Sequence, residues 1–239
     1  MIDRNIIQEK LLEIQSNMTA AANKAGRNPQ NIRLMAVTKT KPAEVIQTLI
    51  DLGVKDIGEN YPDETIEKKY VFDSAPEDVS LHMIGHCQSR KVKIIADLFD
   101  TFQSLDRVDI GIKLNQELLK RQKKMPVFLE MNTGEETSKN GWILKGEHIP
   151  DIFLRDLDQL QSYSQLEING LMTLPPFTED GEDNRRYFAA MQNVMNKLNT
   201  RYGTKMKELS MGTSIDYRVA IEEGATYIRI GTSLVGPRK

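Results

Sequence analysis

The stretch IRLMAVTKTKPAEVIQTLIDLG, residues 32–53, contains the structural unit that the rest of the chain repeats. The run from Ile32 to Thr38 is mostly apolar without strict alternation, which predicts a β-strand buried on both faces. Pro42 fits the first turn of a helix whose apolar face continues up to Gly53. A buried strand followed by an amphipathic helix indicates a parallel α/β fold.

The same strand–helix unit recurs along the chain. Further strands are predicted at Val54–Gly58, Leu81–Gly85, Thr101–Leu105, Val127–Met131, Ile168–Leu174, Glu208–Met211 and Thr226–Ile230. Helical patterns separate them at 60–72, 88–97, 107–123, 147–161, 183–201 and 214–223. Repeated strand–helix–strand order implies parallel pairing with right-handed crossovers.

Another helix precedes the first strand: Asp3 can cap it, and Gly26 is placed to end it in the left-handed conformation. Because few residues follow Ile230, this helix is expected to pack where a helix after the last strand usually lies. We therefore predict an α/β fold, a (β/α)₈ TIM barrel with an extra N-terminal helix, with residues 1–239 as a single domain. A doubly wound open sheet is the alternative, but it would normally carry a Gly-rich dinucleotide loop where this chain has Lys39-Thr40-Lys41-Pro42.

The composition is that of an ordinary globular protein. The 239 residues carry 32 Lys+Arg against 34 Asp+Glu, so binding of nucleic acid through bulk positive charge is not expected. Cys87 is the only cysteine and has no partner for a disulfide or a thiolate metal site. Neither a signal peptide nor an apolar run approaching the ~20 residues of a membrane span is present in the sequence. We expect a monomeric cytoplasmic protein that acts without nucleic acid or membrane.

The predicted strand ends collect most of the unusual polar residues of the chain. They are Lys39, Glu59-Asn60, His86, Asp106, Asn132-Thr133, Met172-Thr173, Ser210-Met211-Gly212 and Gly231-Thr232-Ser233. Binding and catalysis in such barrels occur at the carboxyl ends of the strands, in the loops that follow them. The sequence therefore predicts a site at that end of the barrel.

The loops after the last two strands are rich in glycine and hydroxyl side chains. Ser210-Met211-Gly212-Thr213-Ser214 leads into a predicted helix, and Gly231-Thr232-Ser233 follows the eighth strand. Each cluster alone is also typical of ordinary caps and turns. Since barrels frequently bind phosphate between these two loops, the pair favours a phosphate site.

Lys39 ends the first strand within an apolar run. A solvated lysine is the ordinary interpretation, and a partly desolvated amine that forms a Schiff base with an aldehyde is the functional one. Lys41 competes for that role, but it precedes Pro42 and is expected on the outward N-cap of the next helix. The position of Lys39 at the end of the strand favours Lys39 over Lys41 for this role.

Arg229 lies one residue from the end of the eighth strand, between isoleucines, and needs an acceptor there. A structural salt bridge is one interpretation, and the ring nitrogen or carboxylate of a ligand is the other. His82 lies within a strand and is expected to be a hydrogen-bonded core residue. Cys87 is expected to pack as a small hydrophobe.

Seven stretches, in this order, resemble the pyridoxal phosphate (PLP) homeostasis protein family, small single-domain proteins similar to the N-terminal barrel of alanine racemase. They are Ala36-Val37-Thr38-Lys39-Thr40-Lys41-Pro42, Gly58-Glu59-Asn60-Tyr61, His82-Met83-Ile84-Gly85-His86, Ser138-Lys139-Asn140-Gly141, Gly170-Leu171-Met172, Leu209-Ser210-Met211-Gly212 and Ile228-Arg229-Ile230-Gly231-Thr232. The resemblance covers positions 36 to 232 and implies a PLP-binding barrel of fold-type III.

The resemblance also implies roles for individual residues. Lys39 would hold PLP covalently as a Schiff base, Asn60 would line the pocket, Met172 would lie near the ring and Arg229 would face the pyridine nitrogen. Phosphate contacts would come from Ser210, Gly212, Ser214, Gly231 and Thr232. Two departures affect the outer pocket and any partner surface: Pro62-Asp63-Glu64 replaces a frequent Val-Gln-Glu, and Thr213 replaces a frequent methionine.

By this resemblance the protein would bind PLP, buffer it or deliver it to PLP-dependent apoenzymes, and not turn over a substrate. An arginine at the ring nitrogen weakens the electron sink on which PLP enzymes depend. The chain ends seven residues after Thr232, so we expect the second domain of the racemase to be missing. The alternatives are a PLP-dependent amino-acid racemase or decarboxylase, and a Schiff-base aldolase or sugar-phosphate barrel without a cofactor.

Overall fold

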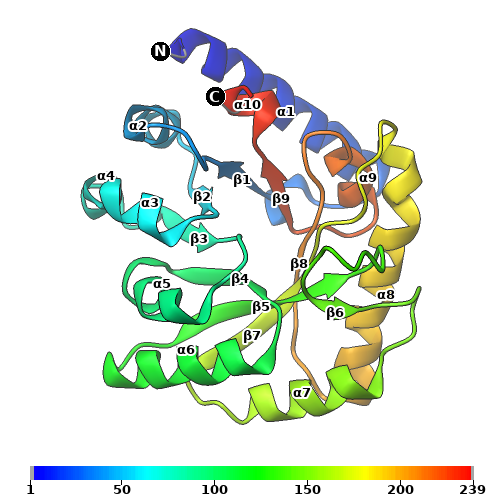
Figure 1. The fold of residues 1–239 in the computed structure, drawn as a ribbon. Coiled ribbons are helices and arrows are strands. Elements are labelled where there is room, and N and C mark those ends of the chain that lie inside the picture. The colour runs from blue at the N-terminus through cyan, green and yellow to red at the C-terminus, as the bar shows by residue number, and fades with distance from the viewer. Residues whose placement is uncertain (1–2, 238–239) are drawn as a thin grey trace.

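A computed structural model describes residues 3–237 and contains a single sheet of parallel strands (Figure 1). The strands are β1 (Arg33–Val37), β2 (Asp56–Glu59), β3 (Ser80–Met83), β4 (Thr101–Leu105), β5 (Met125–Asn132), β6 (Trp142–Ile143), β7 (Leu166–Thr173), β8 (Glu208–Ser210) and β9 (Tyr227–Ile230). Because β1 pairs with both β2 and β9, and β4 pairs with β5, every strand except the short β6 belongs to a closed ring. The predicted (β/α)₈ barrel is confirmed.

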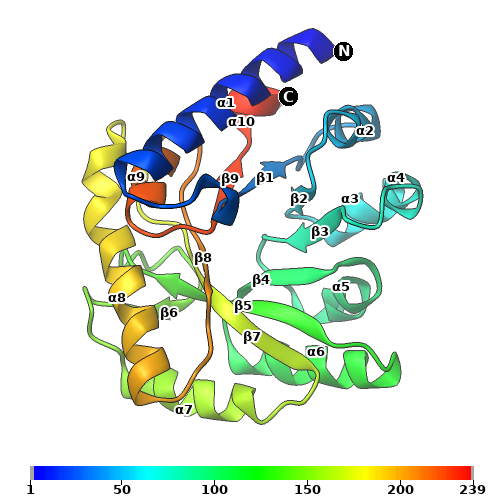
Figure 2. The same ribbon diagram turned by 180° about the vertical axis from the view of Figure 1, so that it is seen from behind.

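Helices surround the barrel, as Figures 1 and 2 show from opposite sides. They are α1 (Arg4–Lys24), α2 (Ala43–Asp51), α3 (Pro62–Glu67), α4 (Lys69–Asp73), α5 (Val92–Leu98), α6 (Val108–Lys120), α7 (Asp151–Gln161), α8 (Arg185–Arg201), α9 (Tyr217–Glu222) and α10 (Thr232–Val235), with 3₁₀ turns η1 (Pro29–Asn31), η2 (Ser89–Lys91) and η3 (Gly181–Asn184). The N-terminal helix α1 packs against α9 and α10, close to the position predicted for it. Asp3 caps α1 by accepting a hydrogen bond from the amide of Asn5 (2.9 Å), and Gly26 follows the helix with φ 66°.

Two predicted helices have different limits in the structure. The helix predicted at 60–72 is divided into α3 and α4 at Lys68, whose side chain turns inward and binds Glu59 at the end of β2. The helix predicted at 214–223 starts only at Tyr217, because the Asp216 carboxylate binds the amide of Thr213 and holds the preceding residues in a loop. Neither β6 nor α10 was predicted, since both are too short to show a periodic pattern.

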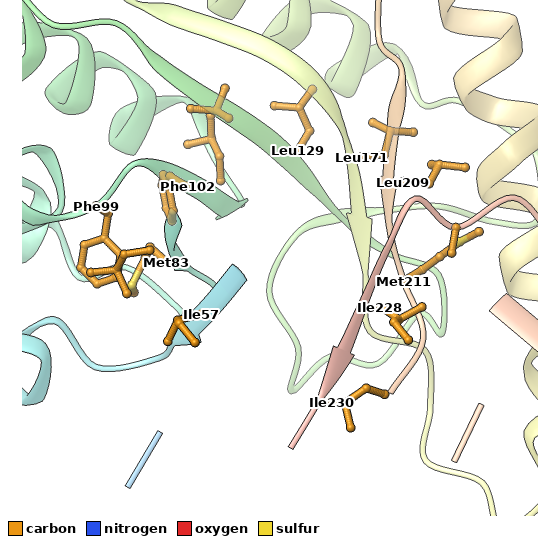
Figure 3. Close-up of a cluster of buried hydrophobic side chains, with 14 of the residues drawn as sticks. Ile57, Met83, Phe99, Phe102, Leu129, Leu171, Leu209, Met211, Ile228 and Ile230 are labelled. Carbon is orange, nitrogen blue, oxygen red and sulfur yellow. The ribbon is translucent and has the colours of Figure 1, made fainter. Parts of the chain in front are cut away.

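The side chains of the barrel strands alternate between an outer and an inner layer. Figure 3 shows part of the outer layer, which shares one apolar cluster with the surrounding helices; the strand residues labelled there include Ile57, Met83, Phe102, Leu129, Leu171, Leu209, Ile228 and Ile230. The inner layer contains a small separate cluster of Met35, Phe128, Met172 and Tyr227. Burial on both faces explains why the strands read as continuous apolar runs.

Several expectations for single residues are confirmed. His82 is 1% exposed and its Nε2 lies 2.8 Å from Asp56 Oδ1, as expected for a hydrogen-bonded core histidine. Cys87 is buried, and burial raises the pKa of its thiol to about 12.

Residues 3–237 contain no cluster of three or more His, Cys, Asp or Glu side chains that could hold a metal ion. No helix among them is long and apolar enough to cross a membrane.

Candidate cofactor site at the barrel rim

Closure of the barrel brings the predicted site residues to one rim, because parallel strands end on the same side. Lys39 follows β1 and Asn60 follows β2, while Met172 lies near the end of β7. Ser210, Gly212 and Ser214 end β8 or follow it, and Arg229, Gly231 and Thr232 lie at the end of β9 or just beyond it. The candidate site residues therefore lie at the carboxyl ends of the barrel strands and in the loops that follow them.

Lys39 lies in a tight turn directly after β1 and is half-buried. The amide of Lys41 donates to the Thr38 carbonyl (2.9 Å), and Thr40 takes φ 62°, which is unusual for a β-branched residue. Strained backbone of this kind clusters at binding sites. The expected outward position of Lys41 is wrong, because its side chain is buried and its ammonium group donates to the Pro237 carbonyl (2.6 Å).

Two carboxylates hold the turn that contains Lys39. The hydroxyl of Thr38 donates to Glu59 (2.8 Å), and the amide of Thr40 donates to Glu64 (2.8 Å). The buried Lys68 ammonium binds both carboxylates, lying 3.1 Å from Glu59 Oε1. Lys68 therefore connects the two groups that fix the residues on either side of Lys39.

Glu59 is fully buried, and burial raises the pKa of its carboxyl group. Its second oxygen, Oε2, has no hydrogen-bond partner within residues 3–237. Sequence reasoning did not identify Lys68, because its only local signal is the spacing of four residues from Glu64, which is common on exposed helices.

The loops after β8 and β9 meet at the rim. The hydroxyl groups of Ser214 and Ser233 lie 2.9 Å apart. Asp216 orders the first loop by accepting hydrogen bonds from the amide of Thr213 (2.6 Å) and from its hydroxyl (3.0 Å). Thr213, which replaces the methionine frequent in the family, therefore helps to hold this loop through its side chain. Gly212 has φ 90°, and a Cβ there would lie 2.5 Å from the Ala220 Cβ, so packing against α9 requires a glycine at this position.

Arg229 is buried at the base of the rim. Its Nη1 donates to Ser210 Oγ and its Nη2 to the Thr173 carbonyl, each at 2.7 Å. Within the described chain it makes no ion pair, and burial lowers its pKa to about 10, with Asp216 and Glu130 opposing that shift. The Ser210 hydroxyl donates to Gln103 Oε1 (2.6 Å), so the structure gives Ser210 a part in holding Arg229.

Asn60 is half-buried next to Gly85, where a Cβ would lie 2.3 Å from the Asn60 carbonyl oxygen. Its side-chain oxygen is buried and has no hydrogen-bond partner among residues 3–237. Burying a polar atom without a partner costs free energy, which a donor on a bound ligand would recover.

Glu130 is a further candidate for the site, which the sequence did not mark. It lies on β5, in register with Met172 of β7. Burial and the Asp106 carboxylate raise the pKa of Glu130 to about 7, while Arg229 and Lys139 oppose the shift. No motif marks it, because its neighbours on the rim come from other strands.

We expect Glu130→Gln to stabilise the fold at alkaline pH. The carboxyl pKa is about 7 in the folded protein against 4.5 unfolded, so the folded state binds more protons between these values and the free energy of unfolding falls as pH rises. At pH ~8 the variant should gain as much as about 3 kcal/mol, and little at pH ~4. Urea denaturation at both pH values measures this. The exposed Glu167→Gln serves as control, and an equal change at both pH values would contradict the assignment.

The fold and the rim define a class of proteins, the parallel barrels of the alanine racemase N-terminal type. The profile of the family described as "Alanine racemase, N-terminal domain" matches residues 10–239. The solved structure of PipY from Synechococcus elongatus with PLP bound superposes with a TM-score of 0.81 at 28% identity, covering 96% of this chain and 100% of that one. An alanine racemase from Clostridium difficile shares the fold, with a TM-score of 0.74 at 14% identity over 96% of this chain and 56% of its own.

Curated relatives narrow the class to one family. The pyridoxal phosphate homeostasis protein of Aquifex aeolicus is 36% identical over 97% of this chain and 98% of its own length. The protein of that name from Escherichia coli is 34% identical over 98% of this chain and 97% of its own. The chain belongs to the pyridoxal phosphate homeostasis protein family.

Proposed function

We propose that this protein binds PLP at the barrel rim, holds it as a Schiff base with Lys39, and buffers it or delivers it to PLP-dependent apoenzymes without turnover of its own. We further propose that it acts as a monomeric single domain in the cytoplasm. The observation that carries the proposal is the convergence, on one rim, of Lys39, Arg229 and the two hydroxyl-rich loops that meet at Ser214 and Ser233. The relatives named for PLP homeostasis, and PipY with PLP bound, support it.

The chemistry of the rim suits the groups of PLP. The two loops offer hydroxyl groups to a phosphate dianion, and the unpartnered oxygen of Asn60 can accept a hydrogen bond. Lys39 would supply the amine that holds the aldehyde of bound PLP, in a linkage that forms with loss of water. Because that linkage is reversible, a protein that forms it can both store and release the cofactor.

Arg229 favours storage over catalysis. With a pKa of about 10 its guanidinium stays charged at neutral pH, so it can only donate to a ring nitrogen and keeps that nitrogen unprotonated. An unprotonated ring is a poor electron sink, and the sink is what PLP enzymes use.

A PLP-dependent racemase or decarboxylase is the second candidate, favoured by Glu130, whose carboxyl group with a pKa of about 7 could exchange protons at the rim. Incubation of the loaded protein with D- and L-amino acids separates the two. Turnover on the order of 1–10³ s⁻¹, which is typical of enzymes, would overturn the storage proposal. We expect none.

A visible spectrum recorded before and after borohydride treatment tests PLP binding itself. We expect a yellow protein whose visible band disappears on reduction and whose label stays attached on denaturation. A protein that remains colourless with added PLP would instead support an aldolase or sugar-phosphate barrel that needs no cofactor.

Thr232→Ala is expected to weaken PLP binding roughly tenfold, because it removes one charge-assisted hydrogen bond to the phosphate at ~1.4 kcal/mol per decade. Titration of the apo protein followed by absorbance measures the change. Thr200→Ala, which removes an exposed hydroxyl from α8 away from the rim, is the matched control. Unchanged affinity in a folded Thr232 variant would place the phosphate in other loops.

A further inference from the structure

A chain of polar side chains crosses the interior of the barrel and ends at Arg229. In order along the chain of bonds its members are Arg33 (β1), Asp56 (β2), His82 (β3), Gln103 (β4), Ser210 (β8) and Arg229 (β9). The bond between Gln103 and Ser210, at 2.6 Å, joins strands that are not neighbours in the sheet and so passes through the barrel interior. All members except Arg33 are at least nine-tenths buried.

The orientation of the Gln103 amide gives the direction of each hydrogen bond in this series. Its nitrogen, which only donates, lies 3.2 Å from His82 Nδ1, so Nδ1 accepts and Nε2 donates to the Asp56 carboxylate (2.8 Å). The amide oxygen of Gln103 faces Ser210. Ser210 must then donate to Gln103, which leaves a lone pair of its oxygen for Arg229.

Asp56, at the opposite end of this series of hydrogen bonds from Arg229, is held by further contacts. Arg33 donates from Nε to Asp56 Oδ2 (2.9 Å) and from Nη1 to the Tyr227 hydroxyl (2.6 Å). Tyr227 packs edge-on against His82, with ring centroids 5.7 Å apart. The carboxylate therefore cannot turn away from the histidine without breaking other contacts.

We propose that Gln103, His82 and Asp56 are positioning residues, which act through Ser210 to fix the orientation of the Arg229 guanidinium beneath the bound cofactor. The inference rests on the proposed function for the cofactor, but the orientation of Arg229 is a property of the protein alone. Two of its N–H groups are taken by Ser210 and by the Thr173 carbonyl, so the remaining donors are directed by those two bonds. Every bond from Arg229 to Asp56 runs in the same donor-to-acceptor direction, so the linked bonds polarise one another and support a single orientation.

Gln103→Met tests the proposal, because methionine fills similar volume, is only a weak acceptor for Ser210 and cannot donate to His82. In isotope-labelled apo protein, the guanidinium N–H signals of Arg229 should be sharp in the native protein and broadened in the variant. In loaded protein, PLP should dissociate roughly tenfold more readily and the visible band should shift. Ser104→Ala is the matched control: it removes a buried hydrogen bond, to the Gly85 carbonyl (2.6 Å), from the adjacent residue of the same strand, and should leave both signals unchanged.

The two readouts separate the possible failures. If the native protein does not bind PLP, the proposed function fails, while the Arg229 signals of the apo protein still decide the positioning role. Arg229 signals and PLP affinity that are the same in folded Gln103→Met and native protein would overturn the inference. Should Gln103→Met not fold, His82→Leu interrupts the chain one residue further from Arg229 and is expected to change both readouts in the same direction, by less.

Discussion

Lys39→Ala is expected to abolish covalent PLP binding and to leave the barrel folded. Lys39 is half-buried in a turn outside β1, whose core contacts come from Met35 and Ala36, so its side chain adds little to packing. The native protein, reduced with borohydride and digested, should carry the label on the peptide that contains Lys39, and the variant should carry none. Weak non-covalent binding through the phosphate loops and Arg229 should remain.

Lys41→Ala is the control for this experiment. Lys41 is buried and binds the Pro237 carbonyl, so its replacement should lower stability and still leave the label in place. A label found on Lys41 or Lys139 in the native protein would show that the geometry of the first strand has been misinterpreted.

Lys68→Met is expected to destabilise the protein by about 3–5 kcal/mol, since removing one partner of a buried ion pair leaves uncompensated charge. Glu59 and Glu64 would then face each other without the ammonium group that binds both. The loss should shrink at low pH, because burial already raises the pKa of Glu59 and its protonation removes the unpaired charge. Urea denaturation as a function of pH measures the effect.

Two further variants make the test of Lys68 specific. Lys69→Met removes the neighbouring charge, whose partner Asp73 is exposed, and should cost at most about 1 kcal/mol. Adding Glu59→Gln to Lys68→Met should restore much of the stability. If the two lysine variants cost the same, Lys68 does not hold the turn. If it does hold the turn, Lys68→Met should also slow the formation of the PLP linkage at Lys39.

The order of the strands and helices could be predicted from the sequence, because it depends on the local periodicity of apolar residues. Buried parallel strands have continuous apolar runs, amphipathic helices separate them, and these patterns alone predict a barrel with Lys39, Ser210 and Arg229 at one end. The helix boundaries at Lys68 and Tyr217 were not accessible, because side chains contacted through the fold, Glu59 and Asp216, decide them.

Local sequence patterns were sufficient to predict the architecture and the end of the barrel at which the unusual polar residues gather. The contacts of these residues depend on how the barrel closes: Ser210 bonds across the interior to Gln103, which lies 107 positions away in the sequence. The pKa of Glu130 likewise depends on burial and on Asp106, which follows β4. Periodicity in the sequence indicates only which face of a strand or helix is buried. Barrel closure and strand register determine which groups lie opposite that face. Hydrogen bonds and charge interactions depend on those opposing groups, so local patterns do not predict them.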